Sequence, residues 1–212
     1  MAASQESSYR VVTRGGTAEI VEKRSRFIAE VFPVHTPEEA EEYIAQVTKR
    51  TWDARHHCHA FVLGSGGAIS RCSDNGEPAG TAGKPILEVL TGAGLTDTLI
   101  VVTRYFGGVL LGTGGLVRAY TEAAQAGLAA SETGSMVLCV PLTLSLSYDL
   151  VGNVQYALRE LDIAIGSEEY TDSVRYEIRV PIETLPRVRT ALIERTDGRI
   201  GIEEGEEGYF LL

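Results

Sequence analysis

Three segments of this 212-residue sequence contain residue types that could do chemistry. The first, residues 53–59, holds three of the four histidines and one cysteine. Because side chains alternate along a strand, His57 and His59 would share one face, opposite to Cys58. A metal site on the two histidines, or a nucleophilic pair of Cys58 with a histidine, would need a partner from elsewhere in the chain. We therefore interpret the segment as a strand whose outward histidines line a cleft.

The second segment, residues 73–85, is rich in glycine and carries two carboxylates, a threonine and a lysine within eleven residues: Asp74, Glu77, Thr81 and Lys84. The backbone N–H groups of such a loop can bind an anion, and Lys84 would add positive charge. It is not a phosphate-binding P-loop, because the Gly-Lys pair is followed by Pro85 rather than by Ser or Thr. The alternative is a plain surface loop with a solvated lysine.

The third segment, residues 107–115, leads from an apolar run into a strongly helical pattern. The free amides at the start of that helix would suit a phosphate or carboxylate, and Arg104 and Arg118 could complete the pocket. The pattern G-x-G-x-x-G of dinucleotide-binding folds is absent. The alternative is that the glycines only let helix and sheet approach closely.

Together the three segments predict one shared anion-binding cleft. Its candidate binding residues are Arg55, His57, Asp74, Glu77, Thr81, Lys84, Arg104, Tyr105, Gly107, Gly108, Gly112, Thr113, Gly114 and Arg118. We expect no metal and no cofactor in it.

The elements that must position these residues are strands followed by helices, which indicates an α+β layer with the helices on one face. Alternation and turn residues predict strands at 10–20, 25–34, 57–63, 68–72 and 98–105. Helical spacing and capping residues predict helices at 37–50, 85–90 and 113–130.

The remainder of the sequence follows the order β-α-β-β-α-β, which is the ferredoxin-like arrangement. Its expected elements are strands at 137–148, 163–170 and 174–181, a last strand from 199, and helices at 149–161 and 184–195. We expect Asp149 to cap the first of these helices.

The charge distribution also indicates two domains. Residues 1–134 hold 12 basic and 15 acidic residues, a net charge of −3, whereas residues 135–212 hold 7 and 14, a net charge of −7. The small, polar residues 128–134 are typical of a short linker. We therefore predict domains at 1–134 and 135–212.

Composition limits the class of protein. The total net charge of −10 excludes a uniformly basic nucleic-acid coat but leaves room for a local basic face. We find no apolar run long enough to span a membrane and no signal-peptide pattern. Three cysteines without a C-x-x-C pair argue against a disulfide scaffold or zinc ribbon, so we expect a cytoplasmic protein.

Four ordered motifs carry a resemblance to the YigZ/IMPACT family across residues 22–130. They are Lys23–Phe27, Asp53–Cys58, Asp74–Pro85, and residues 101–108 with 112–120. The acidic second half resembles the ferredoxin-like tail of the family's bacterial branch, so the resemblance extends over nearly the whole chain.

The resemblance implies a first domain with the ribosomal protein S5 domain 2-like fold, related to a domain of the translocation elongation factor. It also implies an association with translation. Eukaryotic IMPACT proteins regulate translation by competing for the activator of a stress kinase. They do so with an additional N-terminal interaction domain that this sequence does not include, so we do not expect that mechanism here. No enzymatic reaction comes with the bacterial branch.

Three hypotheses for function follow. The first is a binding protein that engages RNA, the ribosome or a translation factor through the basic, glycine-rich cleft. The second is an enzyme acting on a small anionic or phosphorylated substrate there, with Asp74 or Glu77 as base and His57 as proton shuttle. The third is a protein-interaction adaptor that works through the acidic second domain.

Overall fold

The computed structural model describes residues 6–212, which form two compact units. Residues 9–135 make up the described part of the first unit, and residues 136–212 together with 6–8 make up the second. Each unit has its own hydrophobic core, and each is a mixture of helices and strands.

The first unit is built on a five-stranded antiparallel sheet in the order β2-β3-β7-β4-β5. Its strands are β2 (Thr17–Glu22), β3 (Ser25–Pro33), β7 (Thr98–Tyr105), β4 (His56–Leu63) and β5 (Ile69–Ser73). The central strand β7 is buried along almost its whole length, because its β-branched and apolar residues meet a layer on each face. The strands β1 (Ser8–Arg14) and β6 (Leu95–Thr96) pair in parallel and belong to a different sheet.

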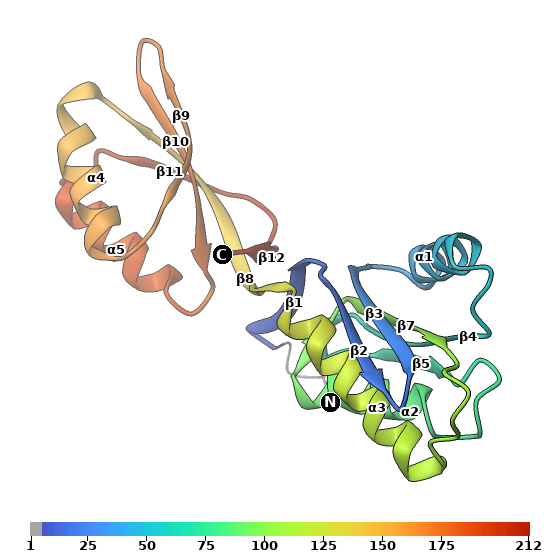
Figure 1. Ribbon diagram of the computed structural model, residues 1–212. Helices are drawn as coiled ribbons and strands as arrows, with labels where there is room; N and C mark the ends of the chain where they lie inside the picture. The colour runs from blue at the N-terminus through green and yellow to red at the C-terminus, as the bar shows by residue number, and fades with distance from the viewer. Residues whose placement is uncertain (1–5) are drawn as a thin grey trace. The chain divides into compact units, whose positions relative to one another are not determined.

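Helices cover both faces of this sheet (Figure 1). The helices α2 (Gly83–Gly92) and α3 (Thr113–Ala129) pack on one face, where the core includes Phe27, Cys58 and Tyr120. The helix α1 (Pro37–Arg50) packs on the other face, against Phe61 and Leu99. The expectation of helices on a single face is therefore wrong, because β7 has apolar side chains on both faces: Ile100 and Val102 on one, Leu99 and Val101 on the other.

Local signals explain several boundaries. The Thr36 hydroxyl accepts from the amide of Glu39 at 3.2 Å and caps α1 as predicted, whereas the Glu39 carboxylate accepts from the amide of His35, one residue before the N-cap. The predicted strand 10–20 is two strands, β1 and β2, because the extended segment is interrupted at Gly15 and Gly16. No side chain fits there, since a Cβ on Gly15 would lie 1.8 Å from the Val31 carbonyl oxygen.

The second unit has the strand order β9-β10-β8-β11 with two helices on one face, which is the ferredoxin-like arrangement. Along the chain its elements are β8 (Glu132–Leu146), α4 (Val151–Glu160), β9 (Ile165–Tyr170), β10 (Val174–Pro181), α5 (Leu185–Arg195) and β11 (Gly201–Glu204). The inward side chains of β10 alternate regularly with exposed ones.

Three details of this half differ from expectation. Asp149 does not cap α4: it lies in a 3₁₀ turn, Tyr148–Leu150, and its carboxylate binds Ser147 and Arg199 instead. An additional strand, β12 (Gly208–Leu211), pairs with β8. The residues expected to form a linker are partly strand, because β8 already begins at Glu132.

Candidate functional site

A pocket of about 420 Å³ opens in the first unit where the end of β7, the start of β4 and the start of α3 meet. Its wall combines cationic groups with apolar ones. The lining residues are Arg55, His56, Glu77, Pro78, Arg104, Phe106, Leu110, Leu111, Gly112, Thr113 and Leu116.

The N-terminus of α3 forms one side of the pocket. Its N-cap is Gly112, whose φ of 73° is accessible to glycine, and no side chain caps the helix. Gly114 is not needed for packing, because the nearest atom to a Cβ placed there is Nη1 of Arg118 at 3.8 Å. The first amides of α3 therefore remain open, and Arg118 adds positive charge beside them.

Two further cationic or polar groups line the pocket. Arg55 is exposed and lines the pocket. The His56 ring is fixed by a 2.9 Å hydrogen bond between Nδ1 and the Asn75 carbonyl oxygen. Because a carbonyl oxygen only accepts, Nδ1 carries the proton, and Nε2 is 4.0 Å from the Glu77 carboxylate.

The base of the pocket is a buried ion pair. Arg104 Nη1 donates to Glu77 Oε1 at 2.5 Å, and both side chains are at least nine-tenths buried. The guanidinium also lies over the rings of Phe27 and Phe106, at 5.4 and 5.6 Å from their centroids. Since Glu77 already neutralises it, Arg104 contributes rigidity here rather than a free charge.

The same network reaches into the core. The Tyr120 hydroxyl donates to Glu77 Oε1 at 2.9 Å and accepts from Cys58 Sγ at 3.2 Å. Burial raises the pKa of the Cys58 thiol to about 12. A thiol that stays protonated is a poor nucleophile, so the Cys58–histidine nucleophile is not supported.

The glycine-rich loop before α2 holds an anion that the protein itself supplies. The Asp74 carboxylate accepts from the amides of Gly80, Ala82 and Gly83 at 2.8 to 3.0 Å. Partial burial raises the pKa of Asp74, but these donors outweigh it and hold the pKa below its ordinary value. Its amides are thus occupied, and the predicted anion cradle in this loop is wrong.

The structure brings five of the fourteen candidate residues to the pocket wall: Arg55, Glu77, Arg104, Gly112 and Thr113. Gly108, Gly114 and Arg118 belong to its rim segments, residues 106–118, without lining it. Gly107 serves packing, because a Cβ there would lie 2.1 Å from the carbonyl carbon of Arg24.

Four other candidates lie away from the pocket. His57 is on the α1 side of the sheet, where Nε2 is 2.8 Å from the Thr51 hydroxyl, and Tyr105 donates to Asp53 on that side. Thr81 is buried and donates to the Pro78 carbonyl oxygen. Lys84 is exposed and pairs with Glu88 at 3.9 Å. Placing these four, and Asp74, in the cleft is therefore wrong.

The pocket also contains residues that the sequence did not single out. His56 pairs across the sheet with Arg104, which in turn pairs with Phe27, so the three share one face. Phe106 is 50% exposed and Leu110 is 83% exposed. The two adjacent leucines inside a glycine-rich loop were the available signal: Leu111 is buried in the core, and Leu110 is left exposed at the pocket.

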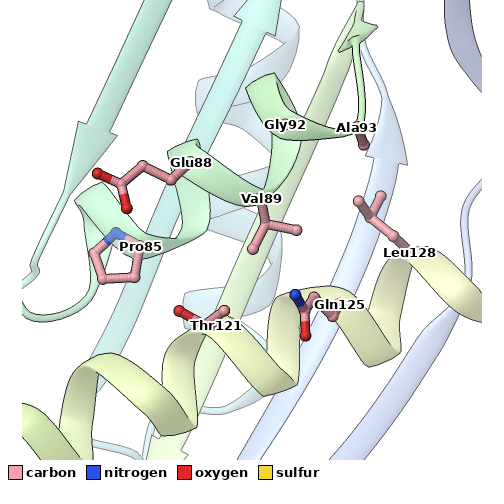
Figure 2. A pocket seen from close by; sticks show the side chains of 8 residues that line it. All are labelled: Pro85, Glu88, Val89, Gly92, Ala93, Thr121, Gln125 and Leu128. Atoms are coloured by element: carbon pink, nitrogen blue, oxygen red, sulfur yellow. The ribbon is translucent and has the colours of Figure 1, made fainter.

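A second cavity of about 500 Å³ lies between α2 and α3. In Figure 2, Thr121 and Gln125 rise from α3 towards α2. The charged side chain among its lining residues is Glu88, so this cavity does not suit an anion. Among residues 6–212 no cluster of histidine, cysteine or carboxylate side chains could hold a metal ion. No helix in that range is long and apolar enough to cross a membrane.

The amino-acid sequence is similar to known protein families over most of its length. Residues 23–128 match the Impact N-terminal domain, and residues 144–199 match a domain of unknown function, DUF1949. The IMPACT family member YvyE of Bacillus subtilis is 39% identical over 95% of this chain and 93% of its own length. The IMPACT family member YigZ of Escherichia coli is 34% identical over 87% and 92%.

Two further matches differ in how much of this chain they cover. Protein IMPACT of Mus musculus is 32% identical over 44% of this chain and 30% of its own length. A solved structure titled as that of a hypothetical protein is 31% identical, with a TM-score of 0.60, over 95% of this chain and 98% of the other.

Proposed function

Because this chain belongs to the IMPACT family, we propose that it is a translation-associated protein that binds RNA through the pocket at the start of α3. The resemblance to IMPACT proteins, whose eukaryotic members regulate translation, supports the association with translation. The proposed place of action is the cytoplasm, and the proposed ligand is single-stranded RNA, including unpaired segments of ribosomal RNA.

One observation carries the proposal: open helix amides, a free arginine and a half-exposed aromatic ring line the same pocket. The amides of Thr113 and its neighbours suit a phosphate, and Arg55 adds charge beside them. The Phe106 ring offers a face on which a base can stack. This is the set of contacts that one nucleotide unit of a single strand requires.

The exposed leucine at the rim favours a polymer over a small metabolite. Leu110 lines the pocket and is 83% exposed, and its neighbour Val109, which does not line the pocket, is 41% exposed, so the apolar surface continues past the pocket. A strand that continues past the pocket would cover it. Apolar surface of this kind is typical of a macromolecular contact.

The groups that an enzyme would need are engaged elsewhere. Asp74 is held by three backbone amides, and Glu77 by Arg104 and Tyr120. His57 lies on the other face of the sheet. The arrangement therefore supports binding better than acid–base catalysis at this site.

The test is binding of a fluorescent single-stranded RNA of about 12 nucleotides, measured by anisotropy between about 50 and 200 mM salt. We expect Phe106→Ala to weaken binding about tenfold, since stacking contributes about 1–3 kcal/mol per base. Arg55→Gln should weaken binding and make the slope of log K against log salt shallower by about 0.7.

Arg187→Gln is the matched control, because Arg187 is an exposed arginine of the second unit. Its binding should equal that of the unsubstituted protein. Absence of binding at the lowest salt, or pocket variants that bind like the control, would overturn the proposal. Ribosome co-sedimentation with the same variants then asks whether the ribosome is the source of the RNA.

A further inference from the structure

The turn between β2 and β3 adopts a conformation that its residues disfavour. Glu22 pairs with Ser25, so Lys23 and Arg24 form a two-residue hairpin loop. Their φ angles are 45° and 67°, which is the pattern of a type I′ turn. Such turns favour Asn-Gly, because side chains at positive φ are strained. Two large basic residues therefore occupy positions where a glycine would be more stable.

No side-chain hydrogen bond or ion pair within residues 6–212 accounts for basic residues at these two positions. Both side chains are exposed, and neither forms a hydrogen bond or ion pair with another described residue. The next basic residue, Arg26, is different, since it makes a two-point ion pair with Glu19 at 2.7 and 2.9 Å. Among the described residues, the strain at positions 23 and 24 thus supports no hydrogen bond or ion pair of the two side chains, and strain of this kind concentrates at functional sites.

The turn is anchored to the pocket described above. The Ser25 hydroxyl accepts from the amide of Gly107 at 3.1 Å and lies 3.5 Å from Nη2 of Arg104. Gly107 packs directly on the Arg24 backbone and follows Phe106, which lines the pocket. Figure 1 shows the β2–β3 turn at the same end of the unit as the start of α3.

We propose that Lys23 and Arg24 form a second phosphate-binding element of the RNA site, contacting the backbone of nucleotides next to the one held in the pocket. This inference rests on the proposed function. Two exposed cations without a hydrogen-bond or ion-pair partner in the described part of the chain, on a tight turn packed against Gly107, fit the phosphodiester backbone of a single strand. Because the two-residue turn fixes the backbone at positions 23 and 24, it also fixes the direction in which both side chains leave the backbone. A longer, relaxed loop would not do so.

Two double variants separate charge from strain. Lys23→Asn with Arg24→Gly removes both charges and supplies the residues that a type I′ turn prefers. Lys23→Gln with Arg24→Gln removes both charges and leaves the strain. Lys49→Gln with Arg187→Gln is the control, because it removes two exposed cations from α1 and α5.

We expect both turn variants to weaken binding of the same RNA several-fold and to make the log–log salt slope shallower by about 1.4, two phosphates at about 0.7 each. Only the Asn-Gly variant should gain thermal stability, by about 2–4 °C. The control should match the unsubstituted protein in affinity.

Two results would overturn the inference while leaving the proposed function intact. One is that both turn variants bind like the control although Phe106→Ala weakens binding. The other is that the Asn-Gly variant gains no stability, which would remove the argument from strain. If the unsubstituted protein binds no RNA at low salt, the proposed function itself fails.

Discussion

The Tyr120 hydroxyl and the Arg104 guanidinium donate to the same oxygen, Oε1 of Glu77. The distance to Oε1 is 2.9 Å from the hydroxyl oxygen and 2.5 Å from Nη1. This shared oxygen joins α3, β7 and the loop before α2 at the base of the pocket. The site therefore has a rigid polar floor beneath an apolar and cationic rim. A ligand would meet preformed geometry rather than order a flexible loop.

Removing Arg104 should destabilise the fold strongly. Arg104→Ala leaves the buried Glu77 carboxylate without its cation, and we expect a loss of about 3–5 kcal/mol in the free energy of unfolding. Tyr120→Phe removes one donor and keeps the packing, so its loss should be smaller, about 1–3 kcal/mol. Urea denaturation measures both. A loss below about 1 kcal/mol for Arg104→Ala would contradict the assigned role of the ion pair.

The Asp74 carboxylate should stabilise the glycine-rich loop but play no part in RNA binding. Asp74→Ala removes the acceptor of three amides, including two at the start of α2, and should cost about 1–2 kcal/mol. Asp74→Asn keeps one acceptor oxygen and should cost less. RNA affinity at a temperature where both variants are folded should not change. A loss of RNA affinity in either variant as large as the loss expected for Phe106→Ala would show that Asp74 belongs to the binding site.

Stability should fall as the pH is lowered through the histidine range. Burial lowers the pKa of His57 and of His59 below the ordinary value of 6.5. Below about pH 6.5 the unfolded chain therefore binds protons that the folded protein resists, which favours unfolding. The urea midpoint should be lower at about pH 5.5 than at about pH 7.5. The difference between the two midpoints should be smaller in His57→Gln. A midpoint that stays constant or rises would contradict this.

Replacing Gly114, the second residue of α3, should raise the stability of the protein and weaken its binding of RNA. Gly114→Ala has open space for its methyl group and a better helix former, so the protein should gain up to about 0.5–1 kcal/mol. The methyl group would crowd the helix amides and weaken RNA binding. Gly152→Ala is the matched control, since Gly152 is the second residue of α4 and also meets open space. Equal affinities of the two variants would show that no ligand approaches Gly114.

Local sequence signals predicted much of the architecture. Thr36 as the N-cap and Pro37 as the first helical residue marked the start of α1, and β-branched residues marked β7 at 98–105. The alternation of apolar residues in β10 likewise marked a half-buried strand. These features depend on neighbours in the sequence, and so they were accessible without the structure.

The candidate site was predicted less well, for two physical reasons. Alternation separated His56 from His57 correctly, but only the packing of α3 decides which face carries the pocket. Composition showed that the loop at 74–83 could hold an anion, but not that Asp74 already fills it. Both answers depend on contacts between distant segments.

The most direct measurement is a two-dimensional amide NMR titration of the full chain with the single-stranded RNA described above. We predict that the amide signals of Thr113, Gly114 and Phe106 shift on binding, whereas those of Ala82 and Gly83, which Asp74 occupies, stay nearly unchanged. Shifts confined to the second unit, or no shifts at the start of α3, would contradict an RNA site in this pocket.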